Sequence, residues 1–326
     1  MVRATGRAMT GIAALCIAAI ALLGQFGRWS DRWDAINIAL PWLTLAALIA
    51  VVAALFVARR RRGPVFWANA IALPLLVAGP VPLLLAERRD GDARSCQGER
   101  LRIVQFNLWK DNRMTRSAAR WIRLVDPDLV LLEEARNTLT VPSLLRDRYP
   151  YSQNCVDRSL CSTVILAKRA PLASGGLARG DPENRGGLSA AWMRIASPAG
   201  PFTVVAVHFG RPWPFRRFEG ERAELIRYVR TQSPATTLVA GDFNLPGWTF
   251  QLRRIEAGMG LERRSRGLPT WPAFVGDHRV PTPLLALDHL FAGRDWAVED
   301  IRRGPFLGSD HYPLVVDLRR CAAASR

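Results

Sequence analysis

The chain lacks internal repeats, low-complexity tracts and Gly/Ser-rich linkers, so nothing in it indicates a repeat architecture or a flexible tether. Acidic residues are scarce: 28 Asp and Glu stand against 45 Lys and Arg, which gives a net charge of +17. A basic balance favours polyanionic partners such as nucleic acid, anionic lipid or phosphate-bearing substrates. Arginine is scattered along the chain, so a general compositional bias stays open as the alternative. At 326 residues, the chain is long enough for one large domain and a second part.

Charge is absent from three long apolar runs near the N-terminus, at 9–26, 35–58 and 64–86. A helix needs roughly 20 apolar residues to cross a bilayer core, so the second and third runs are long enough and the first is marginal. The first run follows Arg3 and Arg7 and could be a signal peptide, but no clean cleavage site follows it. We therefore predict a membrane anchor at 1–90 with three transmembrane helices, in preference to a signal peptide or a soluble hydrophobic hairpin.

An uninterrupted basic block at 59–62 separates the second apolar run from the third. The positive-inside rule places such a block in the cytoplasm. The N-terminus is then cytoplasmic too, and the loop between the first two runs lies outside, together with everything after residue 86. The sequence thus predicts a multi-pass protein of the cell membrane with an extracytoplasmic catalytic domain at 91–326.

Cysteine is also scarce, with one Cys in the first apolar run and four in the predicted external part. An oxidising compartment permits disulfides there. Cys155 and Cys161 bracket a short polar loop and could close it. Cys96 and Cys321 lie at the two ends of the predicted domain, and chain ends often lie close together. Unpaired buried thiols are the alternative.

From residue 101 onward, strand-like segments alternate with helix-like ones. Two segments have helical spacing, 114–125 and 218–230. The segments that read as strands are 101–106, 128–132, 163–167, 188–195, 202–207, 237–240, 285–291 and 313–318. Many strands with few helices between them favour two packed sheets flanked by helices over a doubly wound parallel sheet.

Polar side chains stand where several of these strands end. Asn107 follows the first strand, Glu133 and Glu134 end the second, and His208 ends the segment 202–207. Two acids at the end of a buried strand are costly to desolvate without a partner, and a cation is the natural partner. The pleat of a strand directs only one of the two inward. Taken singly, Asn107 could instead be a capping or turn residue, and His208 could be a hydrogen-bonded histidine at a strand end.

Further polar groups follow the later strands. Asp242 and Asn244 face the same way in an extended segment, where they could hold a nucleophilic water and an oxyanion. Asp288 could orient a histidine, as in the His and Asp pairs that act as general bases. Asp310 and His311, in the sequence Gly-Ser-Asp-His, supply a carboxylate and a base side by side. Carboxylates, carboxamides and histidines suit a hard divalent cation and a phosphate ester.

This ordered set resembles the endonuclease/exonuclease/phosphatase superfamily, which includes deoxyribonuclease I, abasic-site endonucleases, neutral sphingomyelinases and inositol-phosphate phosphatases. The resemblance spans about residues 101–318 and is carried by Asn107, Leu-Glu-Glu134, His208, Gly-Asp242-Phe-Asn244, Leu-Asp288-His and Ser-Asp310-His311. Three apolar runs before such a domain are similar to the YafD-like and teicoplanin-resistance membrane members. The resemblance implies a four-layer α/β sandwich and a phosphoric ester hydrolase that depends on Mg²⁺ or Mn²⁺.

The resemblance also implies a metal site. Glu134 would hold the cation, with Asn107 and Asp310 nearby. The family usually has Gln-Glu where this chain has Glu133 followed by Glu134, so Glu133 adds an unexpected acid. Arg185 resembles a basic residue often found before a family strand, and it would contact the substrate phosphate.

The remaining residues would carry the chemistry, again by resemblance. Asp242 and Asn244 would position the water and the phosphate, and His208 would stabilise the transition state. His311, oriented by Asp288, would remove the proton from a water that attacks phosphorus in line. Such positioned base catalysis contributes about 10²–10⁴-fold to a rate.

The substrate is open at this level. A tethered domain favours substrates already in the membrane, so a lipid-linked phosphate is preferred. Trp213 and Phe215 lie in an Arg-rich loop just after His208, which could meet a membrane interface, stack the bases of a single strand, or be an ordinary Pro-rich loop. A membrane-tethered endonuclease or exonuclease is the alternative, and a non-catalytic membrane-anchored binding or resistance protein is the second. The intact set of acids, amides and histidines argues against the last, and no protein partner can be inferred.

Overall fold

The computed structural model describes residues 2–59, 62–88, 96–135, 140–155, 162–177 and 187–321. The chain divides into two compact units. The first, called the helical unit below, consists of Met1–Arg88 together with Pro246–Arg254. The second, the sandwich unit, consists of Arg89–Leu245 and Ile255–Arg326. A nine-residue segment of the C-terminal sequence therefore groups with the N-terminal helices.

Apolar helices build the helical unit. In chain order they are α1 (Val2–Leu23), η1 (Gly24–Arg28), α2 (Asp31–Asp34), η2 (Ala35–Ala39), α3 (Leu40–Ala58), α4 (Pro64–Ala78) and α5 (Pro80–Leu85). Three stretches are long and apolar enough to cross a membrane: Ala8–Arg28, Asp31–Ala58 and Pro64–Leu85. The third is interrupted at Gly79, where the proline that opens α5 prevents α4 from continuing.

Small side chains line the inside of the helical unit, and large ones lie on its outside. Ala14, Ala18 and Ala21 of α1 are buried in one cluster with Ala47 and Val51 of α3. The exposed large side chains on α3 and α4 include Leu45, Ile49, Val52, Phe56, Ile71 and Leu75. A water-soluble bundle would bury the large residues. Small residues at the helix contacts, with large apolar ones outside, are typical of helices that pack within lipid.

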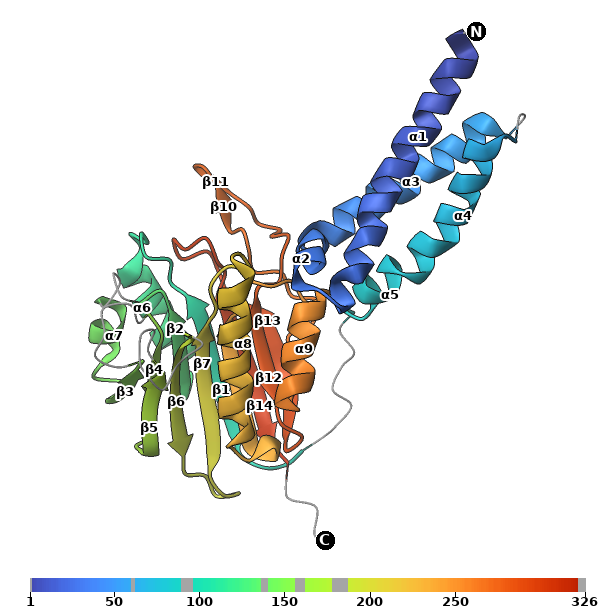
Figure 1. Cartoon of the computed structure of the whole chain (residues 1–326). Helices are drawn as coiled ribbons and strands as arrows, with labels where there is room; N and C mark the ends of the chain where they lie inside the picture. Colours follow the sequence, from blue (N-terminus) through green and yellow to red (C-terminus); the bar gives the residue numbers. More distant parts are fainter. Residues whose placement is uncertain are drawn as a thin grey trace. The chain divides into compact units, whose positions relative to one another are not determined.

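Two six-stranded sheets form the sandwich unit (Figure 1). The first has the order β13–β14–β1–β2–β4–β3, with bounds Trp296–Arg303, Leu314–Arg320, Arg100–Asn107, Leu129–Glu133, Val164–Ala167 and Tyr151–Asn154. The second has the order β5–β6–β7–β8–β12–β9, with bounds Pro171–Leu177, Ser189–Ile195, Phe202–His208, Thr237–Asp242, Asp288–Ala292 and Glu262–Arg263. A short hairpin pairs β10 (Phe274–Val275) with β11 (His278–Arg279).

The main core lies between the two sheets, and helices cover their outer faces. Along β1, Leu101 and Ile103 face the core shared with the second sheet, whereas Val104 and Phe106 face a second cluster. That second cluster holds residues of α6 (Thr115–Val125) and α7 (Thr140–Leu145). On the other sheet, α8 (Phe215–Arg230) packs Tyr228 against Trp192 of β6. The predicted four-layer α/β sandwich is thereby confirmed.

Strand pairing brings the predicted polar residues to one edge of the sandwich. β1 and β2 run parallel, with Asn107 beside Glu133. β7 and β8 also run parallel, with His208 beside Asp242. β12 runs antiparallel to β8, so its first residue, Asp288, also pairs with Asp242. Carboxyl ends of parallel strands meet at the same edge of a sheet, and this edge is where functional residues of such folds gather.

Most of the predicted elements are present, with some differences. Residues 285–287 precede β12 instead of belonging to a strand, since Leu285 forms only an isolated bridge with Trp271. Strands β3, β5 and β13 and helices α7 and α9 (Phe250–Met259) were not predicted. A disulfide joins Cys96 to Cys321, with 4.8 Å between their Cα atoms. This is one of the two pairings that the sequence suggested. The other suggested partner, Cys161, lies outside the described residues.

Candidate active site

His311 and Asp288 form a buried hydrogen-bonded pair. His311 Nδ1 lies 2.8 Å from Asp288 Oδ2, and Thr270 Oγ1 donates to the same oxygen at 2.5 Å. Gln105 Nε2 donates to Asp288 Oδ1 at 2.7 Å. The carboxylate is thus fixed by three partners and in turn fixes the imidazole ring. With Nδ1 directed at Asp288, the other ring nitrogen of His311 points to Asp242, whose Oδ2 is 3.7 Å away.

The charges of this group shift its pKa values strongly. Burial alone would lower the pKa of His311, but the nearby carboxylates of Asp288 and Asp242 outweigh it and raise the pKa to about 10. Burial raises the pKa of Asp242. For Asp288, burial acts in the same direction, but the charge of His311 and the three hydrogen bonds prevail and lower the pKa below its usual range.

Asp242 ends β8 at a point where the chain needs a glycine. Gly241 has a φ of +152°, and a Cβ there would lie 1.9 Å from the carbonyl oxygen of Val207. The close passage of β7 and β8 positions Asp242, whose Oδ1 accepts a hydrogen bond from Asn244 N at 2.8 Å. Its Oδ2 accepts one from Asn107 Nδ2 at 2.9 Å. The Asp242 carboxylate is therefore held from both sheets.

The predicted metal ligands lie beside this group. Asn107 Nδ2 is 3.4 Å from Glu134 Oε1, and the backbone N–H of Lys110 donates to Glu134 Oε2 at 3.0 Å. Trp271 Nε1 donates to Asp310 Oδ2 at 3.3 Å. Burial raises the pKa of Asp310, and the negative charge of Glu134 raises it further. The two carboxylates are close enough to repel each other.

His208 faces the same acids from the end of β7. Its Nε2 lies 3.9 Å from Glu134 Oε1 and 3.9 Å from Asp242 Oδ2. Its Nδ1 is 3.1 Å from Ser162 Oγ, which orients the ring from behind. His208 therefore lies between the carboxylates of Glu134 and Asp242.

Glu133 and Glu134 have different environments although they are neighbours in sequence. Glu133 continues the inward-facing row of Leu129 and Leu131, is fully buried, and accepts a hydrogen bond from Gln105 Nε2 at 2.8 Å. Burial, together with the charge of Asp288, raises the pKa of Glu133 well above its usual range. Burial therefore favours the neutral form of this unexpected acid.

The donor set suits a hard divalent cation. Asp242, Asp288 and His311 each offer a ligand atom, and these atoms lie within 4.8 Å of one another. Asp288 already accepts three hydrogen bonds, so it has little acceptor capacity left for a cation. The carboxylates of Glu134 and Asp310 lie beside this group and are the kind of oxygen ligand that Mg²⁺ and Mn²⁺ prefer. A cation among them would also relieve the repulsion that raises the pKa of Asp310.

The structure assembles eight of the nine residues singled out in the sequence, and the ninth, Arg185, lies outside the described residues. The eight are Asn107, Glu134, His208, Asp242, Asn244, Asp288, Asp310 and His311. Sequence reasoning missed Gln105, Thr270 and Ser309. Ser309 Oγ donates to the backbone oxygen of Asn107 at 2.6 Å and accepts from the N–H of His311 at 3.0 Å, so it fixes two elements of the site. Gln105 had a signal: a polar residue in the core-facing row of Leu101 and Ile103.

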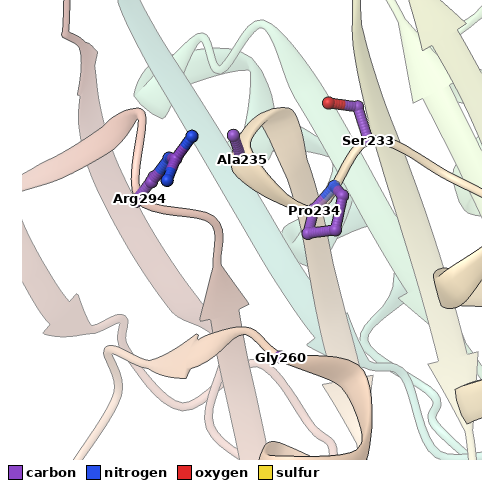
Figure 2. A pocket seen from close by; sticks show the side chains of 5 residues that line it. All are labelled: Ser233, Pro234, Ala235, Gly260 and Arg294. Atoms are coloured by element: carbon purple, nitrogen blue, oxygen red, sulfur yellow. The ribbon is translucent and has the colours of Figure 1, made fainter. Parts of the chain in front are cut away.

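A separate pocket of about 360 Å³ lies away from these residues (Figure 2). It is lined by Ser233, Pro234, Ala235, Gly260 and Arg294. Residues 233–235 immediately precede β8, whereas Asp242 ends it, so the pocket lies at the opposite end of this strand. No predicted site residue lines it, and it has no part in the chemistry described above.

A two-sheet α/β sandwich with a His and Asp pair and a ring of carboxylates at one edge defines a class of metal-dependent phosphoesterases. The sequence matches the endonuclease/exonuclease/phosphatase family over residues 104–311, and the chain belongs to this family. It is accordingly a phosphoesterase, a metal-dependent hydrolase. No curated protein matches the chain.

Solved structures share the fold at low sequence identity. One is an endonuclease/exonuclease/phosphatase from Beutenbergia cavernae, with 19% identity and a TM-score of 0.53 over 69% of this chain and 73% of that one. Another, from Bacteroides vulgatus, has 17% identity and a TM-score of 0.53 over 68% and 99%. A third is D. rerio TDP2 complexed with a single-strand DNA product, with 14% identity and a TM-score of 0.52 over 68% and 99%. At such identities the likeness shows the fold alone.

Proposed function

We propose that this protein is a membrane-anchored phosphoesterase that uses Mg²⁺ or Mn²⁺ and hydrolyses a lipid-linked phosphate by in-line attack of water. The observation that carries the proposal is the pairing of His311 with Asp288, which leaves His311 Nε2 directed at Asp242. A water held by Asp242 Oδ2 would lie within reach of that nitrogen. His311 as the base, Asp242 as the residue that holds the water, and the carboxylates of Glu134 and Asp310 as metal ligands would then surround the position of the attacking water.

Each residue has a definite task in this mechanism. Asp242, fixed by Asn244 and Asn107, orients the water, and His311 Nε2 takes its proton while Nδ1–H stays bonded to Asp288. His208 donates a hydrogen bond to the phosphate as negative charge develops on its oxygens. A cation held by Glu134, Asp310 and Asn107 would neutralise phosphate charge and lower the pKa of His311, so that the imidazole can act as a base.

Aromatic side chains at both ends of the apolar helices support the membrane location. Trp29 and Trp33 are exposed near the junction of the first two stretches. At the other end, Arg59 lies over the ring of Phe56 at 3.9 Å, and Trp67 is exposed. Aromatic belts at both interfaces and basic residues on the cytoplasmic side are typical of membrane-spanning helices. We propose that Arg59 marks the cytoplasmic end and that the sandwich unit is extracytoplasmic.

The loop after His208 supports a substrate at a membrane. Trp213 is 71% exposed, and its ring packs edge-on against the ring of Phe215, with 4.6 Å between the two ring centroids. Arg211 and Arg216 flank this pair. An amphipathic ring beside guanidinium groups suits the interface between headgroups and acyl chains. We propose that the loop brings the site to the phosphate of a lipid.

A membrane-tethered nuclease is the second candidate. One relative of the same fold, TDP2 of D. rerio, is known in complex with a single-strand DNA product. An exposed Trp beside arginines also suits the stacking of unpaired bases. A non-catalytic role is disfavoured, since the acids and the histidines of the site are all present, and His311 and Asp288 form a hydrogen-bonded pair.

The test uses the full-length protein in detergent with Mg²⁺, Mn²⁺ or EDTA. Phosphate release from a polyprenyl pyrophosphate is measured beside nicking of plasmid DNA. We expect metal-dependent phosphate release that is lost in His311→Ala and kept in His278→Ala, a control histidine exposed on β11. Nicking without phosphate release would make the protein a tethered nuclease. Neither activity with any metal would overturn the proposal.

A further inference from the structure

Ser162 forms a hydrogen bond that joins the two sheets beside the active site. It lies just before β4 of the first sheet, and its Oγ is 3.1 Å from Nδ1 of His208, the last residue of β7 in the second sheet. The backbone oxygen of Ser162 accepts a hydrogen bond from Ala135 N at 2.9 Å. Ala135 directly follows Glu134. Ser162 therefore connects the end of β2, which carries a predicted metal ligand, to a histidine of the other sheet.

The next residue along the chain fixes this contact between the sheets independently of the Ser162 hydroxyl. Thr163 is fully buried, and its Oγ1 lies 2.9 Å from Oγ of Ser189, the first residue of β6. Ser189 in turn pairs with His208 between β6 and β7. The contacts of Ala135 and Thr163 remain when the hydroxyl of Ser162 is removed. That hydroxyl therefore acts on the ring of His208 and contributes little to the packing of the two sheets.

The surroundings of His208 favour one of the two tautomers of its neutral ring. Nε2 faces Glu134 Oε1 and Asp242 Oδ2, each 3.9 Å away. A proton on Nε2 is attracted by these oxygens, whereas a lone pair on Nε2 would be repelled by them. The proton is then absent from Nδ1, because in a neutral imidazole one nitrogen donates and the other accepts. Nδ1 therefore needs a donor, and the hydroxyl of Ser162 lies at the distance of a hydrogen bond from it.

The two histidines of the site have partners of opposite kind behind their rings. Behind His311 lies the carboxylate of Asp288, which accepts from Nδ1 and leaves Nε2 able to take a proton. Behind His208 lies the hydroxyl of Ser162, which can donate to Nδ1 and leave the proton on Nε2. These partners match the opposite tasks of the two rings in the proposed mechanism. One ring accepts a proton from water, and the other donates a hydrogen bond to the phosphate.

We propose that Ser162 is a positioning residue of the phosphoesterase: its hydroxyl donates to His208 Nδ1, fixes the ring and keeps the proton on Nε2, where it meets the phosphate. This inference rests on the proposed function, in which His208 donates to the phosphate as negative charge develops. Without the hydroxyl, the ring can rotate and its proton can move to Nδ1, so fewer molecules hold a donor at Nε2. The loss of one neutral hydrogen bond changes an equilibrium by about 3- to 10-fold, and we expect kcat of Ser162→Ala to fall by about that factor.

The first measurement is turnover of bis-p-nitrophenyl phosphate at saturating Mn²⁺ by the full-length protein in detergent. Ser162→Ala should lower kcat in the wild-type protein and have no further effect in His208→Ala, because a residue that acts through His208 loses its role together with it. Ser197→Ala is the matched control. Ser197 lies between β6 and β7, and its hydroxyl donates to the backbone oxygen of Gly200 at 2.9 Å. Its removal should leave kcat unchanged.

The second measurement is nitrogen NMR of the histidine rings, which reports the tautomer directly. The chain has four histidines, so in isotope-labelled protein the signals of His208 can be assigned by their loss in His208→Ala. Spectra are recorded with Mg²⁺, because Mn²⁺ is paramagnetic, at a pH at which the ring is neutral. We expect a protonated Nε2 and a hydrogen-bonded, unprotonated Nδ1 in the wild-type protein and in Ser197→Ala. In Ser162→Ala, part of the protein should carry the proton on Nδ1.

Three outcomes would overturn the proposal. A proton on Nδ1 of His208 in the wild-type protein would make Ser162 an acceptor and not a donor. A kcat of Ser162→Ala within about twofold of wild type would show that the hydroxyl contributes nothing to turnover. An equal loss in the His208→Ala background would mean that Ser162 acts through the fold. An inactive wild-type protein would count against the proposed function only, because the NMR spectra show without turnover whether Ser162 keeps the proton on Nε2.

Discussion

Replacing Asp288 by Asn tests the His and Asp pair at the centre of the site, since it keeps the shape and removes a charge. Asp288 uses Oδ1 to accept from Gln105 and Oδ2 to accept from Thr270 and His311. An amide has one oxygen, and when this faces Gln105 its NH₂ group faces His311 Nδ1. The imidazole can accept that hydrogen bond only as the tautomer with its proton on Nε2. That nitrogen can then no longer take a proton from water.

The size of the effect follows from what the pair supplies. Positioned base catalysis contributes about 10²–10⁴-fold, and the same change in the His and Asp pair of a serine protease lowers kcat about 10⁴-fold through the wrong tautomer. We expect kcat to fall by about 10³- to 10⁴-fold in Asp288→Asn. The pKa of His311 should fall as well, because the charge of Asp288 is a main cause of its elevation to about 10.

The assay is turnover of bis-p-nitrophenyl phosphate at saturating Mn²⁺ by the full-length protein. The double variant Asp288→Asn, His311→Ala should be no slower than His311→Ala alone, because the two residues act as one unit. Asp317→Asn is the control: Asp317 is a buried, ion-paired carboxylate of β14 outside the site, so stability should fall and kcat should not. A kcat for Asp288→Asn within threefold of wild type would refute the reasoning.

Three further outcomes are expected. Glu134→Gln should weaken Mn²⁺ binding at least about 10-fold, as measured by calorimetric titration, and unchanged affinity would remove Glu134 from the metal site. Glu133→Gln should raise the free energy of unfolding by about 1 kcal/mol or more at pH 8 and leave it unchanged near pH 4. An acid whose pKa is raised in the folded state destabilises the protein as the pH rises above the pKa of that acid in the unfolded state. Urea unfolding at both pH values measures this, and equal effects of the substitution at the two pH values would contradict it. Removing the Cys96–Cys321 disulfide should cost about 2–5 kcal/mol of stability, and equal urea midpoints with and without reductant would show that it contributes nothing.

The architecture could be predicted where strands are buried and apolar. β2, β7 and β8 are mostly apolar and β1 alternates, and the ends of these strands carry the polar residues that the fold brings together. β3 and β5 were missed because they read differently: Tyr151–Asn154 is polar and largely exposed, and Pro171–Leu177 contains two glycines. Each lies at the edge of its sheet, where a strand needs little apolar surface to be stable.

The inner part of the site shows a different limit of sequence reasoning. The motifs located Asp242, Asp288 and His311, because the chemistry requires those residue types. Gln105 and Thr270 hold Asp288 through hydrogen bonds to residues 183 and 18 positions away, and no local pattern records such partners. The capping of α9 by Asp34 could not be predicted for the same reason, since Phe250 and Gln251 lie 216 and 217 residues after Asp34 in the sequence.

The same contact restricts how the chain can cross a membrane. Asp34 lies at the start of the second apolar stretch, and Phe250 follows all three, so their hydrogen bond places both residues on the same side of any membrane that the chain crosses. The number of crossings between them would then be even, zero included. Two crossings, one by α3 and one by α4–α5, meet this condition, and a single crossing does not. The contact thus excludes an odd number of crossings between residues 34 and 250, and it agrees with the topology that hydropathy and the basic block at 59–62 predict.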